Sequence, residues 1–313
     1  MYNIEYLYFW FEKLQKMKIK SWISAFRLRT LPLSLSGIIL GSFIAREHGY
    51  WDPYIFFFAL LTTLFFQVLS NLANDLGDSQ KGTDNEQRIG PMRAVQSGVI
   101  SQKEMKKAVI VFSLLSLFSA SYLIKLSSLG MNKEMISIYG ILAILSILAA
   151  ITYTVGKRAY GYNGFGDVFV FIFFGLVSVL GSYTLYTKHL DWEVVFPAIT
   201  IGMLSTAVLN LNNMRDRIND ANAGKITVVV KLGKEKAKKY HLFLVIIAIV
   251  SLIFSVSHFG FLQYVFLLPV VLLAAHLKKV LTTQDEKDFD PELKKVALTT
   301  FGISIIYLII SII

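Results

Sequence analysis

Two polar islands interrupt a sequence that is otherwise dominated by apolar residues. The first island spans residues 71–101 and reads NLANDLGDSQKGTDNEQRIGPMRAVQSGVIS. The second spans residues 209–225 and reads LNLNNMRDRINDANAGK. Each island follows a long apolar run and contains an Asn-x3-Asp pair, which starts at Asn71 in the first and at Asn212 in the second. The two copies predict two half-sites that face each other across one cavity.

The spacing of the acidic residues predicts that each island begins as the continuation of a membrane helix. Offsets of four and seven place Asn71, Asp75 and Asp78 on one helix face, because successive residues are rotated by about 100°. The second island repeats the pattern, with a spacing of four, at Asn212, Asp216 and Asp220. Carboxylates gathered at the end of a membrane helix are costly unless something neutralises them. A divalent cation that carries a phosphorylated ligand would do so.

A third polar stretch combines cations with tyrosines over residues 152–167, TYTVGKRAYGYNGFGD. Its glycine spacing is wrong for a dinucleotide-binding fingerprint, and the segment before it is typical of a membrane helix rather than of a strand. Two interpretations remain open. The stretch is either a flexible cytoplasmic turn or part of a site for a phosphate and a carbocation, since an aromatic face stabilises a cation.

The elements that must position these residues are membrane helices. The 313-residue chain is 55% hydrophobic and only 17% charged, and its mean hydropathy is +0.57. These values are typical of a membrane protein, in which one span needs about 20 residues. We therefore expect an all-α polytopic membrane protein with nine transmembrane helices. The expected spans are roughly residues 28–46, 54–76, 106–125, 134–153, 165–186, 193–212, 240–257, 260–277 and 294–313.

The distribution of Lys and Arg predicts the orientation of these helices. The chain has 31 such residues and a formal net charge of +10. With the N-terminus in the cytoplasm, all of them fall on the cytoplasmic side except Arg46, Lys125, Lys133 and Lys188. Both polar islands then face the cytoplasm, as expected for a multi-pass protein of the cell membrane that uses Mg2+ and a soluble phosphorylated metabolite. Because the cations follow the membrane orientation, nucleic acid is not an expected partner.

The N-terminal residues predict contact with the membrane surface. Aromatic and Lys residues over 1–20 are typical of an interfacial amphipathic segment. We therefore expect this segment to be followed by a single transmembrane domain over residues 21–313. Arg27 and Arg29 open the first span. They either contact lipid headgroups or turn inward to help bind an anion.

The connection after the first acidic cluster is long for a loop between spans, and such loops are often functional lids. Gly90 and Pro91 are expected to break the helix and let the chain fold back. Ser101, followed three residues later by Glu104, predicts a capping box at the start of the next helix.

The residue types exclude several kinds of chemistry. The chain has no Cys, which rules out disulfides, Cys-ligated metals and thiol catalysis. Its five His residues are scattered without metal-ligand spacing, and we assign none of them a catalytic role. No nucleophile stands near the islands. The expected reaction is therefore ionisation of a diphosphate ester, with the acceptor supplied by a second substrate and a long lipid tail on one of the two.

The motifs resemble those of a known family. Asn71-x3-Asp75-x2-Asp78 and Asn212-x3-Asp216-x3-Asp220 look like the two aspartate-rich motifs of the UbiA-type intramembrane prenyltransferases, which have nine transmembrane helices. Within that family, NDLGDSQKGTDNEQRIGPMRAVQSG and AYGYNGFGDVFVFIFFG resemble the 1,4-dihydroxy-2-naphthoate polyprenyltransferase branch. The resemblance covers nearly the whole chain after residue 20.

The resemblance implies transfer of a polyprenyl group from its diphosphate to 1,4-dihydroxy-2-naphthoate with loss of CO2, which gives demethylmenaquinone. It implies Mg2+ held by Asp75, Asp78, Asp216 and Asp220, with Asp84 as a further ligand and Asn71 and Asn212 assisting. The allylic cation would form near Tyr153. The candidate partners of the diphosphate are Lys81, Arg88, Arg93, Lys157, Arg158 and Arg215.

Other functions remain open from the sequence. The same fold could prenylate another acceptor, such as 4-hydroxybenzoate or haem. CDP-alcohol phosphotransferases also use aspartates at the membrane edge, but they carry a Gly-x2-Ala-Arg element that this chain lacks. An ion-coupled transporter would place its carboxylates near the bilayer midplane rather than at helix ends. Prenyl chain length and oligomeric state do not follow from these residues.

Overall fold

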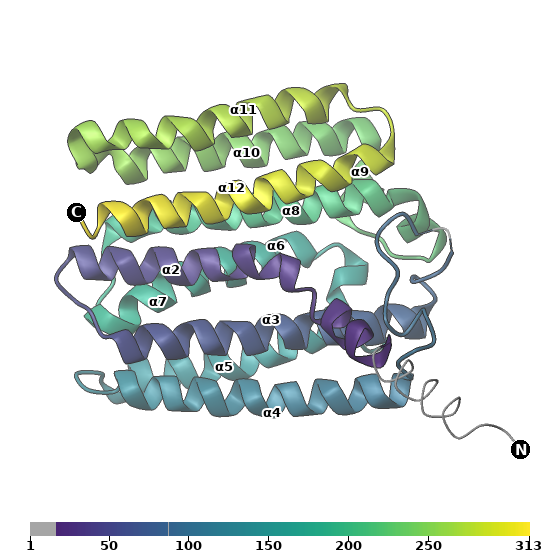
Figure 1. The fold of residues 1–313 in the computed structure, drawn as a ribbon, viewed down its shortest axis with the longest axis horizontal. Coiled ribbons are helices and arrows are strands. Elements are labelled where there is room, and N and C mark those ends of the chain that lie inside the picture. The colour runs from purple at the N-terminus through teal and green to yellow at the C-terminus, as the bar shows by residue number, and fades with distance from the viewer. Residues whose placement is uncertain (1–16, 87) are drawn as a thin grey trace, which may run out of the picture.

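The apolar runs of the sequence fold into long helices that run side by side through a bundle (Figure 1). The computed structural model describes residues 17–86 and 88–313, and these contain helices and no strands. The expected all-α class is confirmed for this part of the chain. Most of the predicted interfacial segment, residues 1–16, lies outside the described residues, and residues 17–20 are helical, in a helix that continues to residue 26.

Each predicted span overlaps one or more helices of the structure. The long ones are α2 (Leu31–Glu47), α3 (Pro53–Lys81), α4 (Gln102–Ser127), α5 (Lys133–Thr152), α7 (Ser178–Thr187), α8 (Val195–Asn222), α10 (Lys234–Val256), α11 (Leu267–Thr282) and α12 (Phe289–Ile310). Shorter helical segments are η1 (Leu28–Thr30), η2 (Tyr160–Asn163), α6 (Gly166–Val170), η3 (Phe171–Val177), η4 (Trp192–Val194), α9 (Val228–Leu232), η5 (Ser257–Phe266) and η6 (Glu286–Asp288).

By length and composition, eight segments of the described chain are long and apolar enough to cross a membrane. One of them, Lys234–Thr282, contains both α10 and α11. The chain leaves helical geometry between these two helices at Gly260, where φ is 57° and ψ is −127°. The helices also leave large apolar side chains exposed, such as Phe118 on α4 and Ile141 on α5. Apolar surface on membrane-length helices is expected to face lipid, so the chain is a multi-pass membrane protein.

Two helices extend well past the spans predicted for them. α3 continues to Lys81 rather than ending near residue 76, and α8 continues to Asn222 rather than near residue 212. The acidic residues at the start of both islands are therefore helical, as their spacing predicts. The capping box is also confirmed, because Ser101 Oγ accepts from the Glu104 amide and the Glu104 carboxylate accepts from the Ser101 amide.

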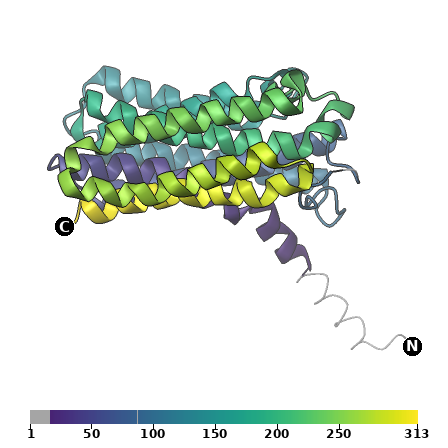
Figure 2. The ribbon, with the colours of Figure 1, turned by 90° about the horizontal axis from the view of Figure 1, so that it is seen from above.

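The helices are arranged around α2 and α8. Helix α2 contacts α3, α7, α8 and α12, and α8 also contacts α10. In Figure 1, α3, α4 and α5 form one side of the bundle and α10, α11 and α12 form the other, and Figure 2 shows the same bundle from above. The α3–α4 connection and α9 lie at the same end of the bundle (Figure 1). This end carries both polar islands.

Glycines allow the central helices to approach closely. A Cβ added to Gly41 of α2 would overlap the backbone carbonyl of Val179 in α7, and one on Gly175 would lie 2.6 Å from the Cα of Gly202 in α8. Small residues at such crossings are the usual means by which membrane helices pack. Gly175 lies in η3, a π-helical turn that interrupts the predicted span 165–186.

The Gly41 crossing predicts a specific loss of stability. Gly41→Ala should lower the free energy of unfolding by about 1–3 kcal/mol, because the added methyl group meets backbone atoms that cannot move aside. Gly140→Ala is the control, since a Cβ at Gly140 in α5 would meet no atom within 4 Å. Thermal unfolding of the purified proteins in detergent measures both. Equal melting temperatures for the two variants would contradict this packing.

Candidate active site

The four helical aspartates of the two islands are all buried. Asp75 and Asp78 lie on α3, with 1% and 7% of their surface exposed, and Asp216 and Asp220 lie on α8, with 4% and 1% exposed. The two helix ends are joined directly, because Asn219 Nδ2 donates to the carbonyl of Thr83 at 2.8 Å. The two islands therefore meet in the structure, as their repeated motif predicts, whereas a single cavity shared by both remains a prediction.

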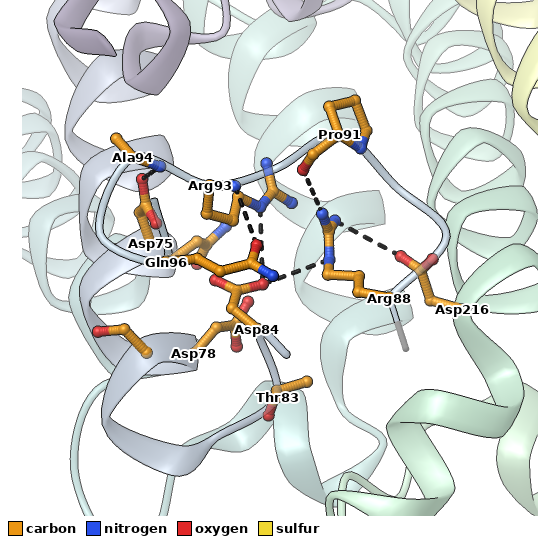
Figure 3. Close-up of polar contacts among 12 residues, drawn as sticks. Asp75, Asp78, Thr83, Asp84, Arg88, Pro91, Arg93, Ala94, Gln96 and Asp216 are labelled. Carbon is orange, nitrogen blue, oxygen red and sulfur yellow. Dashed lines mark hydrogen bonds and ion pairs between the residues drawn. The ribbon is translucent and has the colours of Figure 1, made fainter. Parts of the chain in front are cut away.

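The loop over residues 82–101 folds across these acids and brings cations to them (Figure 3). Arg88 of the first island bridges to the second. Its Nε lies 3.3 Å from Asp84, and one terminal nitrogen lies 3.6 Å from Asp216. Its other terminal nitrogen donates to the carbonyl of Pro91 at 2.6 Å. The Ala94 amide donates to Asp75 at 3.2 Å. The loop thus closes over the acids of both helices.

Asp84 lies in the loop after α3, and burial changes the pKa of its carboxyl group. Its side chain has no exposed surface. Arg88 Nε and Arg93 Nε approach the same carboxylate oxygen of Asp84, Oδ1, at 3.3 and 3.8 Å. Burial, together with the negative charge of Asp78, raises the pKa of Asp84 to about 6 despite these cations. Burial also holds the pKa of Arg93 well below its usual value, with Arg27 and Arg88 as nearby positive charges.

In the second island, Arg215 holds the local arrangement together. Its guanidinium donates two hydrogen bonds to Asp216, at 3.0 and 2.7 Å, and one to Asn212 Oδ1 at 2.7 Å. It also pairs with Asp290 of α12. Arg215, a candidate partner of the diphosphate, therefore binds the metal-binding candidate Asp216 through a bidentate pair of the strong, charge-assisted type, and Asn212 contacts Arg215 rather than Asp216.

Lys225 is a cation of the site for which the sequence patterns predicted no role. It is the last residue of the second island and is buried, and its Nζ lies 3.4 Å from Asp220 Oδ1. Burial lowers the pKa of Lys225, but the carboxylates of Asp220 and Asp78 more than offset this, so its pKa lies above the ordinary value. The sequence signal that could have indicated this role is the Gly224-Lys225 pair directly after the acidic helix. In the structure Gly224 has a φ of +72°, and the chain turns there so that Lys225 lies beside the acids.

Asn71 has a different role in the structure from the one its motif suggests. Its Nδ2 donates to the carbonyl of Phe26 at 2.9 Å and to Thr30 Oγ1 at 3.3 Å, and its Oδ1 accepts from Gln67. These bonds hold the break between the N-terminal helix and α2. At this break, Arg27 adopts a left-handed backbone conformation with a φ of 48°, which is uncommon for a residue other than glycine.

Arg27 and Arg93 line a cavity of about 260 Å³ beside Asp75. Arg27 Nε, one terminal nitrogen of Arg27, Arg93 Nε and Asp75 Oδ1 are buried and make no hydrogen bond. Buried donors without partners are costly. Of the two alternatives for Arg27, the geometry favours anion binding over contact with lipid headgroups. Arg29 also lines the cavity but is largely exposed.

Tyr153 packs beside the buried aspartates, whereas Lys157 and Arg158, which follow it in the sequence, point to the surface. The Tyr153 ring lies 5.2 Å from that of Tyr160, edge to face, and burial raises the pKa of its hydroxyl to about 12. Lys157 and Arg158 are exposed, and the structure gives them no ion pair within the described residues. In this structure Lys157 and Arg158 therefore do not join the cations of the two islands beside the buried aspartates.

The donor set suits a hard divalent cation. Buried oxygens of Asp75, Asp84 and Asp220 make no hydrogen bond, which is the condition expected of carboxylates kept for a cation. Within the described residues, no three acidic or His side chains converge into a complete metal cage. Mg2+ is usually bound through one or two carboxylates, substrate phosphates and waters rather than by such a cage. The residues therefore fit Mg2+ bound together with a diphosphate.

Known proteins resemble this chain in sequence and in fold. A 1,4-dihydroxy-2-naphthoate octaprenyltransferase of Haemophilus influenzae is 41% identical over 304 residues, which cover 95% of this chain and 97% of the relative. The apo structure of a UbiA homolog from Aeropyrum pernix K1 superposes with a TM-score of 0.66 at 16% identity, over 91% of this chain and 98% of the other.

A UbiA homolog from Archaeoglobus fulgidus bound to GPP and Mg2+ superposes with a TM-score of 0.60 at 15% identity, covering 91% of this chain and 99% of the other. The two structural similarities concern the fold alone. The sequence profile of the UbiA prenyltransferase family matches residues 34–301. The chain therefore belongs to the UbiA prenyltransferase family.

Proposed function

We propose that this protein transfers a polyprenyl group from its diphosphate to 1,4-dihydroxy-2-naphthoate with loss of CO2, giving the reduced, hydroquinone form of demethylmenaquinone for menaquinone biosynthesis. The observation that carries the proposal is the 41% identity, over nearly the whole of both chains, to a naphthoate octaprenyltransferase. The geometry supports it, because the two acidic islands converge and a cavity lined by buried Arg nitrogens without hydrogen bonds adjoins the first island at Asp75.

The aspartates of the two islands would hold Mg2+. Buried oxygens of Asp75, Asp84 and Asp220 that make no hydrogen bond support this role, as does the fold shared with a homolog bound to GPP and Mg2+. When bound, Mg2+ neutralises the diphosphate and so makes it a better leaving group. The proposed ligands are Asp75, Asp78, Asp84, Asp216 and Asp220.

The cations of the islands would bind the diphosphate oxygens directly. Lys81, Lys225 and Arg88 lie beside the acids and supply positive charge where negative charge grows as the carbon–oxygen bond breaks. Tyr153 lies close enough to Asp78, Asp220 and Lys225 to feel their charges, and its ring would stabilise the allylic cation. Lys157 and Arg158 could contribute only after a movement of their loop, because they are exposed.

The cavity beside Asp75 would hold the acceptor. Arg27 and Arg93 present buried donors that match a carboxylate, and about 260 Å³ is enough for a small aromatic acid. The ring carbon that carries the carboxylate would form the new bond to the prenyl carbon. The carboxylate would then leave as CO2, and its bonding electrons would return to the ring. The Arg pair would therefore orient the ring toward the prenyl diphosphate.

The topology forms part of the proposal. Because α10 and α11 are separate helices within one of the eight membrane-length segments, the chain would cross the membrane nine times. An odd number of crossings places the termini on opposite sides. The excess of Lys and Arg at the active-site end supports a cytoplasmic N-terminus and an active site that faces the cytoplasm. Residues 1–20 would lie at the membrane surface, before one domain over residues 21–313.

The first prediction concerns the reaction. The protein, incubated with Mg2+, a long prenyl diphosphate and 1,4-dihydroxy-2-naphthoate, should form a prenylated product that has lost CO2, as measured by mass spectrometry. Asp75→Ala and Asp216→Ala should abolish it while the protein stays folded, and so should EDTA. If 4-hydroxybenzoate were prenylated instead, the family would stand but the acceptor would be wrong.

The second prediction concerns Arg27. Arg27→Gln should raise the KM for the naphthoate acceptor about tenfold or more, because it removes charged donors to the carboxylate. The KM for the prenyl diphosphate should change little. Arg29→Gln serves as the control, since Arg29 borders the same cavity but is exposed. A rise in the KM for the prenyl diphosphate alone would assign Arg27 to the phosphates.

The third prediction concerns pH. Asp84 has a pKa of about 6 in the folded protein, against 3.8 for an unperturbed Asp, so the folded state keeps this proton to higher pH than the unfolded chain does. Stability is therefore lost as pH rises through this window. In EDTA, Asp84→Asn should be more stable than the parent at pH 7.5, by up to about 3 kcal/mol, and the gain should shrink at pH 5. A variant that is less stable at pH 7.5 would refute the cost assigned to this carboxylate.

A further inference from the structure

Tyr162 joins the three polar stretches of the sequence. It lies in η2, is 8% exposed, and its hydroxyl is 2.7 Å from Asp78 Oδ1 and 2.5 Å from Thr83 Oγ1. Its backbone carbonyl accepts the amide of Ile226 at 3.0 Å, directly after Lys225. One side chain from the third stretch thus contacts the first island, and its backbone contacts the residue that follows the second.

The direction of the hydrogen bonds at this hydroxyl is fixed by chemistry. An ionised carboxylate can only accept, so Tyr162 donates its proton to Asp78. The Tyr162 oxygen must then accept from Thr83, whose own carbonyl accepts from Asn219 of α8. Burial raises the pKa of Tyr162, which keeps the hydroxyl protonated. Thr83 is thus held to α8 through its backbone carbonyl, and its hydroxyl acts through that of Tyr162 to orient one oxygen of Asp78.

The ring of Tyr162 makes a second, separate set of contacts. Lys81 Nζ lies 3.8 Å from the ring centroid, and Lys225 Nζ lies 5.6 Å from it. Both distances are within the range of cation–π attraction. The ring contributes no proton acceptor, so it holds the ammonium groups near the acids without occupying their hydrogen-bond donors. The N–H groups of Lys81, and those of Lys225 that do not face Asp220, can then donate to an anion.

We infer that Tyr162 is a positioning residue with two separable roles: its hydroxyl orients the metal-binding carboxylate Asp78, and its ring places Lys81 and Lys225 for the diphosphate. The inference rests on the proposed function for the identity of metal and anion. A tyrosine that only filled the core would not need to place its hydroxyl on a buried carboxylate and its face against two ammonium groups. Groups that orient a metal ligand typically change metal affinity about 10- to 100-fold when removed.

Two variants separate these roles. Tyr162→Phe removes the hydroxyl but keeps the ring, and Tyr162→Leu removes both. The measurement is retention of a radiolabelled, non-reactive prenyl thiolodiphosphate, at tracer concentration, by the full-length protein as Mn2+ is titrated. Tyr162→Phe should raise the half-saturating Mn2+ concentration about tenfold or more, while retention at saturating Mn2+ stays near that of the parent. Tyr162→Leu should also lower retention at saturating Mn2+.

The control is Tyr160→Phe, because the Tyr160 hydroxyl donates to the carbonyl of Ala149 and touches no acid. It should leave both quantities unchanged. An unshifted Mn2+ titration in Tyr162→Phe would overturn the role of the hydroxyl, and equal retention by the Phe and Leu variants at saturating Mn2+ would overturn the role of the ring. Failure of the parent protein to retain the analogue at any Mn2+ concentration would instead overturn the proposed function.

Discussion

The burial of several carboxylates at one end of a membrane bundle is the constraint on which the rest of this structure depends. Asp75, Asp78, Asp216 and Asp220 are each less than 10% exposed, and like charges in a poorly solvated region repel strongly. Neutralisation has to come from nearby groups. Arg88 forms ion pairs with Asp84 in the first island and Asp216 in the second. Arg215 also pairs with Asp216, and Lys225 pairs with Asp220. The oxygens left without partners are those available to a metal ion.

This constraint accounts for the unusual lengths of α3 and α8. Both helices continue beyond their apolar residues, so that their acids are held on rigid backbone rather than on loops. Close crossings at glycines hold the neighbouring helices in place, with α2 against α7 at Gly41 and η3 against α8 at Gly175 and Gly202. The loop over residues 82–101 then needs only to bring cations across the gap. Rigid helices and a covering loop together suit a site that must hold charged groups and exclude water.

The sequence predicted the parts of this arrangement that depend on local patterns. Helical offsets placed the acids on shared faces, and the Ser101–Glu104 spacing gave a capping box. It did not predict contacts between distant segments. Tyr162 and Asp78 are 84 residues apart, and the orientation of Arg27 depends on a left-handed backbone that no motif marks. Likewise, His241 and His276, far apart in sequence, have Nε2 atoms 2.8 Å apart in the bundle.

The central claim is that both acidic islands and their cations form one site for a metal-bound diphosphate. A structure of the protein with Mn2+ and a non-reactive prenyl diphosphate analogue tests it most directly, since anomalous scattering locates the metal. The account predicts Mn2+ in contact with carboxylates of both α3 and α8, and the diphosphate between Lys81 and Lys225. Metal bound to one helix only, or a diphosphate outside the space between the islands, would contradict it.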